Sequence, residues 1–372
     1  MASSAVMGLI SMTMRVVKAF RPKPAVYDKS KVERILVITT TAIGDTLLST
    51  PALRALDEFY PRAQITALVG ASAYPVLKHN PRVVEMVRHP GRVDLAYLFK
   101  LPALLGSLRR ARFDLAVVLH GNDPDSVPLA FLSGAPFILG MVKTAFPNFL
   151  TWYRLPAVGE HIIWSKLNAL SALGVERLET DAQHMEMTIT AKEDDEAARI
   201  LHERGLRGDV AAIHPFGSKP TRSWDIKKAA ELADRLVDEL GLAIVILGGP
   251  KEAEASRRIA ELMNNDALFT AGAVELRLSA AIIKKSSVVV STDSGPMHIA
   301  EAFDIPLVAI LGSTLATATG PLSEESIVLQ HLEVCDVPRA CKQYKCDHIS
   351  CMKAVGVEEV IGAVKRVYRV PQ

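Results

Sequence analysis

The feature that most constrains the fold is an alternation of short apolar segments with longer amphipathic ones, which begins at Val32 and starts again near Asp209. The short segments have the length and composition of buried strands, and the longer ones read as helices, several of which end at a glycine. The expected strands are residues 34–40, 64–70, 114–120, 209–215, 242–250, 287–291 and 306–313. Alternating strands and helices form parallel sheets, so we expect an α/β protein with two successive doubly wound sheets.

The restart of the pattern divides the chain into four expected parts. A length of 372 residues already favours two domains of ordinary size, and a 49% hydrophobic content argues against disorder. We expect a basic and apolar N-terminal arm (1–31), a Rossmann-like domain (32–207), a second Rossmann-like domain (208–354) and a C-terminal helix (355–372).

The charge is unevenly distributed between these parts. The formal net charge of the whole chain is only +2, which argues against a general nucleic-acid binder. Residues 1–31 contain six basic residues and one acidic residue, Asp28, which gives a net charge of +5. The remaining 37 basic and 40 acidic residues give −3, so the excess of positive charge belongs to the N-terminal arm.

Within the arm, the apolar stretch AVMGLISMTM comes first and the cations follow it, unlike the order in a secretory signal. No apolar run in the chain reaches the ~18 residues that a membrane-spanning helix needs. One interpretation is an interfacial helix at residues 5–23, with Arg15, Lys18 and Arg21 at the headgroups of an anionic membrane. A helix that docks on its own domain, or a disordered leader, explains the same pattern.

The segment STDSGPMHIAEAF follows the expected strand at 287–291 and begins a helix. The first backbone N–H groups of a helix have no intrahelical partners and carry a partial positive charge, so this end attracts anions. Gly295 leaves room for a phosphate, Pro296 suits the first helical position, and Ser294 adds a hydroxyl beside Asp293. A plain N-capped helix after a tight turn is the alternative.

Two neighbouring loops favour the anion site. FGSKPTRSW follows the first strand of the second half and contains Gly217, Ser218, Lys219 and Arg222, while GGPKEAE follows the next strand and contains Glu252. Ligands of open α/β sheets bind at the carboxyl ends of the strands, where these loops meet. Phosphate-compatible groups and an acid suited to a ribose hydroxyl together predict one nucleotide site.

The first half carries a different strand-to-helix turn, TTTAIGDTLL. Gly44 stands alone in it, so neither the GxGxxG fingerprint nor a GxxxxGK[ST] phosphate loop is present. Asp45 fits two roles. It suits the N-cap of a helix, or a carboxylate at a cleft that accepts a proton.

Taken together, these stretches resemble glycosyltransferase family 9, the ADP-heptose:lipopolysaccharide heptosyltransferases. The resemblance covers most of residues 33–370. The stretches that match the family are RILVITTTAIGDTLLSTPALRAL, HPFGSKPTRSW, LGGPKEAE and STDSGPMHIAEAFDIPLVAILGST. It implies a GT-B fold, in which two Rossmann-like domains face each other, with the acceptor on the first and the nucleotide-sugar donor on the second. The C-terminal helix of such proteins usually packs back on the first domain.

The resemblance also implies an inverting transfer of a heptose or related sugar from an ADP-activated donor to a lipopolysaccharide-core or related glycolipid acceptor. Asp45 matches the family's catalytic base, and no metal or other cofactor is required. The residues that match donor-binding positions are Ser218, Lys219, Arg222, Glu252, Val274, Asp293, Ser294, Gly295, Pro296 and His298. A nucleotide-sugar epimerase, or a non-catalytic nucleotide-sugar-binding protein on the same scaffold, is the alternative. The expected location is the cytoplasm, at the cytoplasmic face of the inner membrane.

Two further patterns concern metals. Asp123-Pro-Asp125 has the form of the DxD motif of metal-dependent glycosyltransferases, but we favour a turn in which Asp125 caps a helix. A zinc site is also considered for four cysteines that lie close together in the sequence, namely Cys335, Cys341, Cys346 and Cys351. Zinc sites usually show closer CxxC pairs, so reduced thiols are the default in a cytosolic protein, with disulfides as a further alternative.

Overall fold

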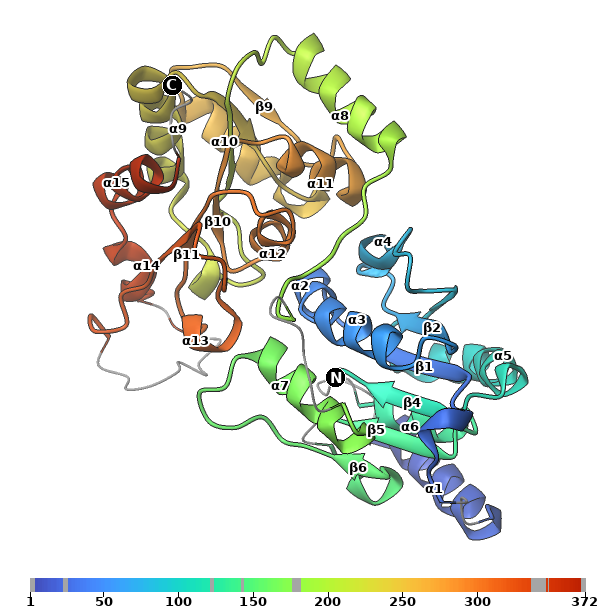
Figure 1. Cartoon of the computed structure of the whole chain (residues 1–372). Coiled ribbons are helices and arrows are strands. Elements are labelled where there is room, and N and C mark those ends of the chain that lie inside the picture. Colours follow the sequence, from blue (N-terminus) through green and yellow to red (C-terminus); the bar gives the residue numbers. More distant parts are fainter. Residues whose placement is uncertain are drawn as a thin grey trace. The chain divides into compact units, whose positions relative to one another are not determined.

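The computed structural model of the protein is shown in Figure 1. It describes residues 4–22, 26–120, 124–141, 144–175, 182–335, 346 and 348–368. The chain divides into two compact units, Met1–Thr188 and Ile189–Gln372.

Unit 1 is built on a six-stranded parallel sheet in the order β3-β2-β1-β4-β5-β6. The strands are β1 (Arg34–Thr39), β2 (Gln64–Val69), β3 (Glu85–Arg88), β4 (Leu115–Val118), β5 (Phe137–Gly140) and β6 (Trp152–Tyr153). The helices are α1 (Ser4–Phe20), α2 (Ile43–Leu47), α3 (Thr50–Phe59), α4 (Tyr74–Leu77), α5 (Leu95–Ala111), α6 (Ser126–Leu132) and α7 (Ile162–Ala169). Helix α3 packs against α7, while α6 contacts α1, α5 and the central strands.

Unit 2 repeats this plan with a six-stranded parallel sheet in the order β12-β11-β10-β7-β8-β9. The strands are β7 (Val210–His214), β8 (Ala243–Ile246), β9 (Ala267–Phe269), β10 (Val288–Thr292), β11 (Leu307–Ile310) and β12 (Ser326–Leu329). The helices are α8 (Ala191–Glu203), α9 (Ile226–Leu240), α10 (Ala253–Leu262), α11 (Leu276–Lys284), α12 (Gly295–Ala302), α13 (Ala316–Thr319), α14 (Ser350–Ala354) and α15 (Val357–Val367).

Both sheets reverse their winding next to their first strand. In unit 1 the chain runs from β1 outward through β2 and β3, then returns to β4 on the other side of β1. In unit 2 it runs from β7 through β8 and β9, then returns to β10 on the other side of β7. A crevice forms at such a switch point, at the carboxyl ends of the strands, and this is where open α/β sheets bind ligands. The expected pair of doubly wound sheets is confirmed.

The C-terminal helix α15 contacts α9, β10, β11 and β12, which all belong to unit 2. Its apolar face, spaced as one side of a helix, is buried in the core of that unit. Nζ of Lys365 also lies 2.6 Å from Oε2 of Glu239 on α9. The expected packing of residues 355–372 on the first domain stays a prediction.

The division between the units also falls earlier than expected, after Thr188 rather than at 207/208. Helix α8, which the sequence pattern assigned to the first domain, packs on α11 of unit 2. Two ion pairs tie it there. Nε of Arg277 lies 2.5 Å from Oε1 of Glu193, and Nζ of Lys285 lies 2.6 Å from Oδ2 of Asp194.

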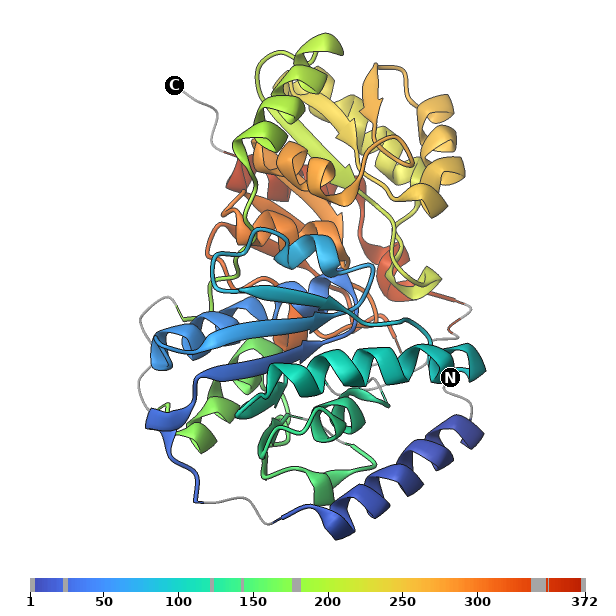
Figure 2. The same ribbon diagram turned by 90° about the vertical axis from the view of Figure 1, so that its right-hand side faces the viewer.

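The N-terminal arm forms α1, the dark blue helix on the outside of unit 1 in Figure 2. Val6, Ile10 and Met14 are buried, and the helix contacts α6, so the arm docks on its own unit. Lys18 donates from Nζ to the carbonyl oxygen of Asn148 at 2.6 Å. Arg21 donates to the carbonyl oxygens of residues 131, 134 and 135. These two cations, expected at headgroups, therefore hold the helix to the protein. Among the described residues, no helix has both the length and the apolar character to span a bilayer.

Candidate functional site

The loop after β7 is shaped by one close backbone approach and two hydrogen bonds. A Cβ atom at Gly217 would lie 2.5 Å from the carbonyl oxygen of Arg222, so only glycine allows the loop to fold back this far. The N–H of Gly217 donates to Oγ of Ser223 at 3.0 Å, and Oγ1 of Thr292 on β10 donates to the carbonyl oxygen of Phe216 at 2.6 Å. The folded loop therefore carries Arg222 to the end of β10.

There Arg222 pairs with Asp293. Its Nη1 lies 3.3 Å from Oδ2 of Asp293, which is buried directly behind β10. Nε of Arg222 is also buried, and it has no hydrogen-bond partner among the described residues. A buried donor normally has an acceptor, so this guanidinium is oriented by the carboxylate and still has a donor available for a ligand.

A second cluster of side chains is centred on His214 at the end of β7, and it includes Glu252 after β8 and Ser294 after β10. Its Nδ1 is hydrogen-bonded to Oγ of Ser294 at 3.0 Å, and its Nε2 lies 3.7 Å from Oε2 of Glu252. The same Glu252 oxygen accepts from the N–H of Gly249 at 2.5 Å. The interaction with His214, above all, lowers the pKa of Glu252, while burial opposes this shift. Glu252 therefore stands as an ionised acceptor beside the switch point of unit 2.

The start of α12 lacks the side-chain cap that a plain N-capped helix would have. Ser294 occupies the N-cap position in extended conformation, yet its hydroxyl makes no cap hydrogen bond. Instead it bonds to His214 and to the carbonyl oxygen of Thr292, at 3.0 and 3.1 Å. The backbone N–H groups of this first turn, next to Gly295, are the groups that an anion would use.

The other predicted donor contacts are less defined. Ser218 is exposed and Lys219 half-buried in the folded loop after β7, and Val274 is half-buried in the loop after β9. Pro296 lies in the first turn of α12, and His298 is buried on the same helix. Their contacts with a donor stay predictions.

In unit 1, Asp45 lies within the first turn of α2, and the N-cap position belongs to Ala42. The cap role for Asp45 is therefore wrong. Its side chain is 36% exposed, and Oδ1 lies 3.4 Å from Nε2 of His120. Asp45 follows β1 and His120 follows β4, the two strands that flank the switch point of this sheet.

Lys166, which no sequence pattern singled out, contacts the backbone of Asp45. This lysine of α7 is fully buried, and its Nζ donates to the carbonyl oxygen of Asp45 at 3.1 Å and to Oγ of Ser49 at 2.7 Å. Burial lowers the pKa of Lys166 to about 8, and the negative charge of Asp45 opposes this shift. A lone lysine in the apolar run of residues 161–174 was the signal that could have found it.

The residues considered for metal binding have other surroundings. Asp125 occupies the N-cap position of α6, as expected, but its side chain makes no cap hydrogen bond. It is buried, and its Oδ2 lies 2.7 Å from Nε2 of His89. Asp123 and Cys341 lie outside the described residues. The thiols of the three described cysteines are free, and burial raises the pKa of Cys351. Within the described ranges, no three His, Cys, Asp or Glu side chains are grouped to hold a metal ion.

Comparison with known proteins gives consistent matches. Residues 102–348 match glycosyltransferase family 9 (heptosyltransferase). Lipopolysaccharide heptosyltransferase 2 of Escherichia coli strain K12 is 28% identical over 319 residues, which cover 80% of this chain and 88% of that protein. The crystal structure of a family 9 glycosyltransferase from Veillonella parvula DSM 2008 superimposes with a TM-score of 0.77 at 25% identity, covering 90% of this chain and 97% of the other. The structure of the E. coli ADP-heptose lipopolysaccharide heptosyltransferase II gives a TM-score of 0.76 at 23% identity, with 90% and 98% covered. Since the family match spans more than half of the chain, the protein belongs to glycosyltransferase family 9 and has the GT-B fold.

Proposed function

We propose that this glycosyltransferase moves a heptose, or a closely related sugar, from an ADP-activated donor to a lipopolysaccharide-core or related glycolipid acceptor. Family membership and the similarity to lipopolysaccharide heptosyltransferase 2 support this proposal. The observation that carries the donor assignment is the pairing of Arg222 with Asp293 beside the uncapped start of α12. A guanidinium group and the N–H groups of a helix start at a switch point suit a nucleoside diphosphate.

In this proposal the diphosphate binds at the amides next to Gly295 and at Arg222, with Ser218 and Lys219 nearby on the same loop. Glu252 accepts a hydrogen bond from a ribose hydroxyl, which its lowered pKa favours because the ionised form accepts. Val274 packs against the adenine.

Asp45 is the proposed general base. Its carboxylate takes the proton of an acceptor hydroxyl while that oxygen attacks the anomeric carbon. The bond from the sugar to ADP breaks on the opposite side, and ADP leaves with the electron pair, so the configuration is inverted. Lys166 touches none of the reacting atoms in this scheme, and it acts by holding the backbone of the Asp45 turn.

The acceptor class is amphiphilic, which suggests where the enzyme works. We place it in the cytoplasm, at the cytoplasmic face of the inner membrane, with residues 5–23 next to the lipid surface. The exposed apolar side chains of α1 support this location.

The decisive experiment compares Asp45→Asn with the unchanged enzyme in the transfer of heptose from ADP-heptose to lipopolysaccharide-core fragments. Loss of the base is expected to lower kcat by roughly 10²–10⁴-fold, with ADP affinity unchanged, because ADP binds on unit 2 in this proposal. Asp266→Asn, which changes an exposed carboxylate of unit 2, serves as the control. Full activity of Asp45→Asn would remove Asp45 from the mechanism. Conversion of the donor without any acceptor would instead indicate an epimerase.

A further inference from the structure

Helix α1 carries an apolar face that its own unit does not cover. The exposed residues are Leu9, Met12, Val16 and Phe20, with 52, 66, 50 and 85% of their surfaces accessible. Their spacing of three, four and four residues puts them on one side of the helix, which we term the α1 stripe. Val6, Ile10 and Met14 lie on a different side and are buried. The helix therefore has two apolar faces, of which one is buried and the other is largely exposed among the described residues.

The same segment carries a positive charge, and no ion pair joins Arg15, Lys18 or Arg21 to an acidic side chain within the described ranges. The first acidic residue of the chain is Asp28, whereas Arg15, Lys18, Arg21 and Lys23 precede it. Lys18 and Arg21 donate to backbone carbonyl oxygens, which carry no net charge and so do not neutralise the cations. Arg15 is exposed on the helix.

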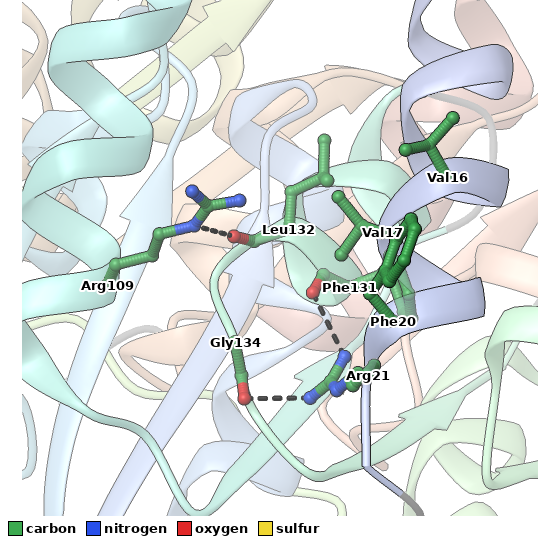
Figure 3. Close-up of a pocket in the computed structure, with 8 residues that line it drawn as sticks. All are labelled: Val16, Val17, Phe20, Arg21, Arg109, Phe131, Leu132 and Gly134. Atoms are coloured by element: carbon green, nitrogen blue, oxygen red, sulfur yellow. Dashed lines mark hydrogen bonds between the residues drawn. The ribbon is translucent and has the colours of Figure 1, made fainter.

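The stripe ends at an apolar hollow of about 460 Å³, shown in Figure 3. Its apolar walls are Val16, Val17 and Phe20 from α1 and Phe131 and Leu132 from α6. Arg21 and Arg109 lie on two sides of it, and Nε of Arg109 donates to the carbonyl oxygen of Leu132 at 2.8 Å. The volume falls within the range of about 300–1,000 Å³ that is typical of small-molecule sites. An apolar hollow with guanidinium groups at its edge matches a lipid with an anionic headgroup.

We propose that the α1 stripe docks on a bilayer that contains anionic phospholipid, and that the hollow beside Phe20 receives one lipid acyl chain. Leu9, Met12, Val16 and Phe20 enter the level of the headgroups, and the exposed Arg15 meets lipid phosphates. Lys18 and Arg21 add positive charge while their side chains bind backbone carbonyl oxygens. A second copy of the chain is the competing occupant of the stripe. Pairing two stripes would bring two segments of uncompensated positive charge together, which like-charge repulsion opposes. A negatively charged bilayer satisfies both the apolar face and the charge.

This inference rests on the proposed function and extends it, because it names the partner that the N-terminal arm binds. The test is co-sedimentation of the full chain with vesicles of phosphatidylcholine mixed with phosphatidylglycerol, and with vesicles of phosphatidylcholine alone. The unchanged protein is expected to bind the mixed vesicles and to release them at high salt, since charge contributes to the attraction. Equal binding to both compositions would overturn the role of anionic lipid.

Two variants separate the contributions. The triple variant Leu9→Ser/Val16→Ser/Phe20→Ser is expected to weaken vesicle binding roughly 100-fold or more, because each side chain loses its burial in lipid. Arg15→Gln is expected to weaken it roughly five-fold. Leu262→Ser and Arg207→Gln change an exposed apolar and an exposed basic residue of unit 2 and are expected to bind as the unchanged protein does.

The outcomes distinguish this proposal from the transferase proposal. The triple variant is expected to keep its melting temperature and its transfer to a soluble acceptor fragment, because the stripe is exposed and distant in sequence from Asp45. If the unchanged protein binds vesicles but transfers no sugar, the transferase proposal is wrong and the docking proposal stands. Unchanged vesicle binding of the triple variant would overturn the docking proposal. So would a finding that the unchanged protein is a dimer and the triple variant is a monomer.

Discussion

Lys166 shows how one residue connects the core of unit 1 to Asp45, the proposed general base. A buried ammonium group is costly in free energy unless it is hydrogen-bonded, and here the partners are the carbonyl oxygen of Asp45 and the hydroxyl of Ser49. Ser49 also donates to the same carbonyl oxygen at 2.7 Å. The three groups hold the turn from which the Asp45 side chain projects.

The pKa of Lys166 leads to a prediction for stability. The unfolded lysine has a pKa of 10.5, and burial lowers the pKa in the folded chain to about 8. Below the lower value both states are protonated, so the folded state bears the full cost of the buried charge. Between the two values the unfolded chain holds a proton that the folded chain has lost. The free energy of unfolding should therefore rise with pH in this window, by about 3 kcal/mol.

Chemical denaturation across this pH window, for the unchanged protein and for Lys166→Met, measures the effect. The variant lacks the titrating group, so the difference between the two proteins isolates Lys166 from every other residue that titrates there. A difference that stays constant with pH would show that the lysine is not held as the structure indicates.

At the scale of the elements, the strands that the sequence analysis did not predict share one property. They are β3, β5, β6, β9 and β12, each with four residues or fewer. Four of the five form the edges of the two sheets. An edge strand is covered less completely, so it lacks the continuous apolar run that identifies a central parallel strand.

The loop between β7 and α9 provides an element-scale prediction. Gly217→Ala adds a Cβ that would lie 2.5 Å from a backbone oxygen, so the loop has to open and carry Arg222 away from Asp293. We expect ADP affinity, measured by calorimetry, to fall about ten-fold or more, because the diphosphate loses charge-assisted hydrogen bonds.

The matched control is Gly362→Ala in α15. A Cβ at Gly362 meets no atom within 4 Å, so this change is expected to raise the free energy of unfolding by about 0.5–1 kcal/mol and to leave ADP affinity unchanged. Unaltered ADP binding by Gly217→Ala would show that the folded loop does not position the donor.

For the whole molecule, we expect transfer to proceed at an unchanged rate in EDTA. The negative charge that develops on the leaving diphosphate is proposed to meet Arg222 and the amides of α12, while Asp125 of the DxD-like motif is paired with His89. Initial rates of ADP release with EDTA and with added Mn²⁺ provide the measurement. A strict Mn²⁺ requirement would contradict this mechanism, and rescue by Zn²⁺ would point to the cysteine segment instead.

The sequence alone determined which segments form the central strands, which helices follow them, and which loops lie at the carboxyl ends. It did so because burial on both faces imposes a local composition, and because strand-end loops need glycine or charged residues of particular kinds. Arg222, Glu252 and Ser294 were placed in one region by this reasoning, and the structure brings each of them to the switch point of unit 2.

Tertiary structure decided what local pattern does not encode, namely the partner of each buried face and charge. The amphipathic pattern of α15 shows that one side is buried, but only the packed core assigns that side to unit 2. In the same way, Asp125 had the sequence signature of a helix cap, and it faces His89, which lies 36 residues away in the chain. Lys166 meets Asp45 from 121 residues away. Such contacts depend on which elements the folded sheet places side by side, and a pattern of neighbouring residues carries no record of that choice.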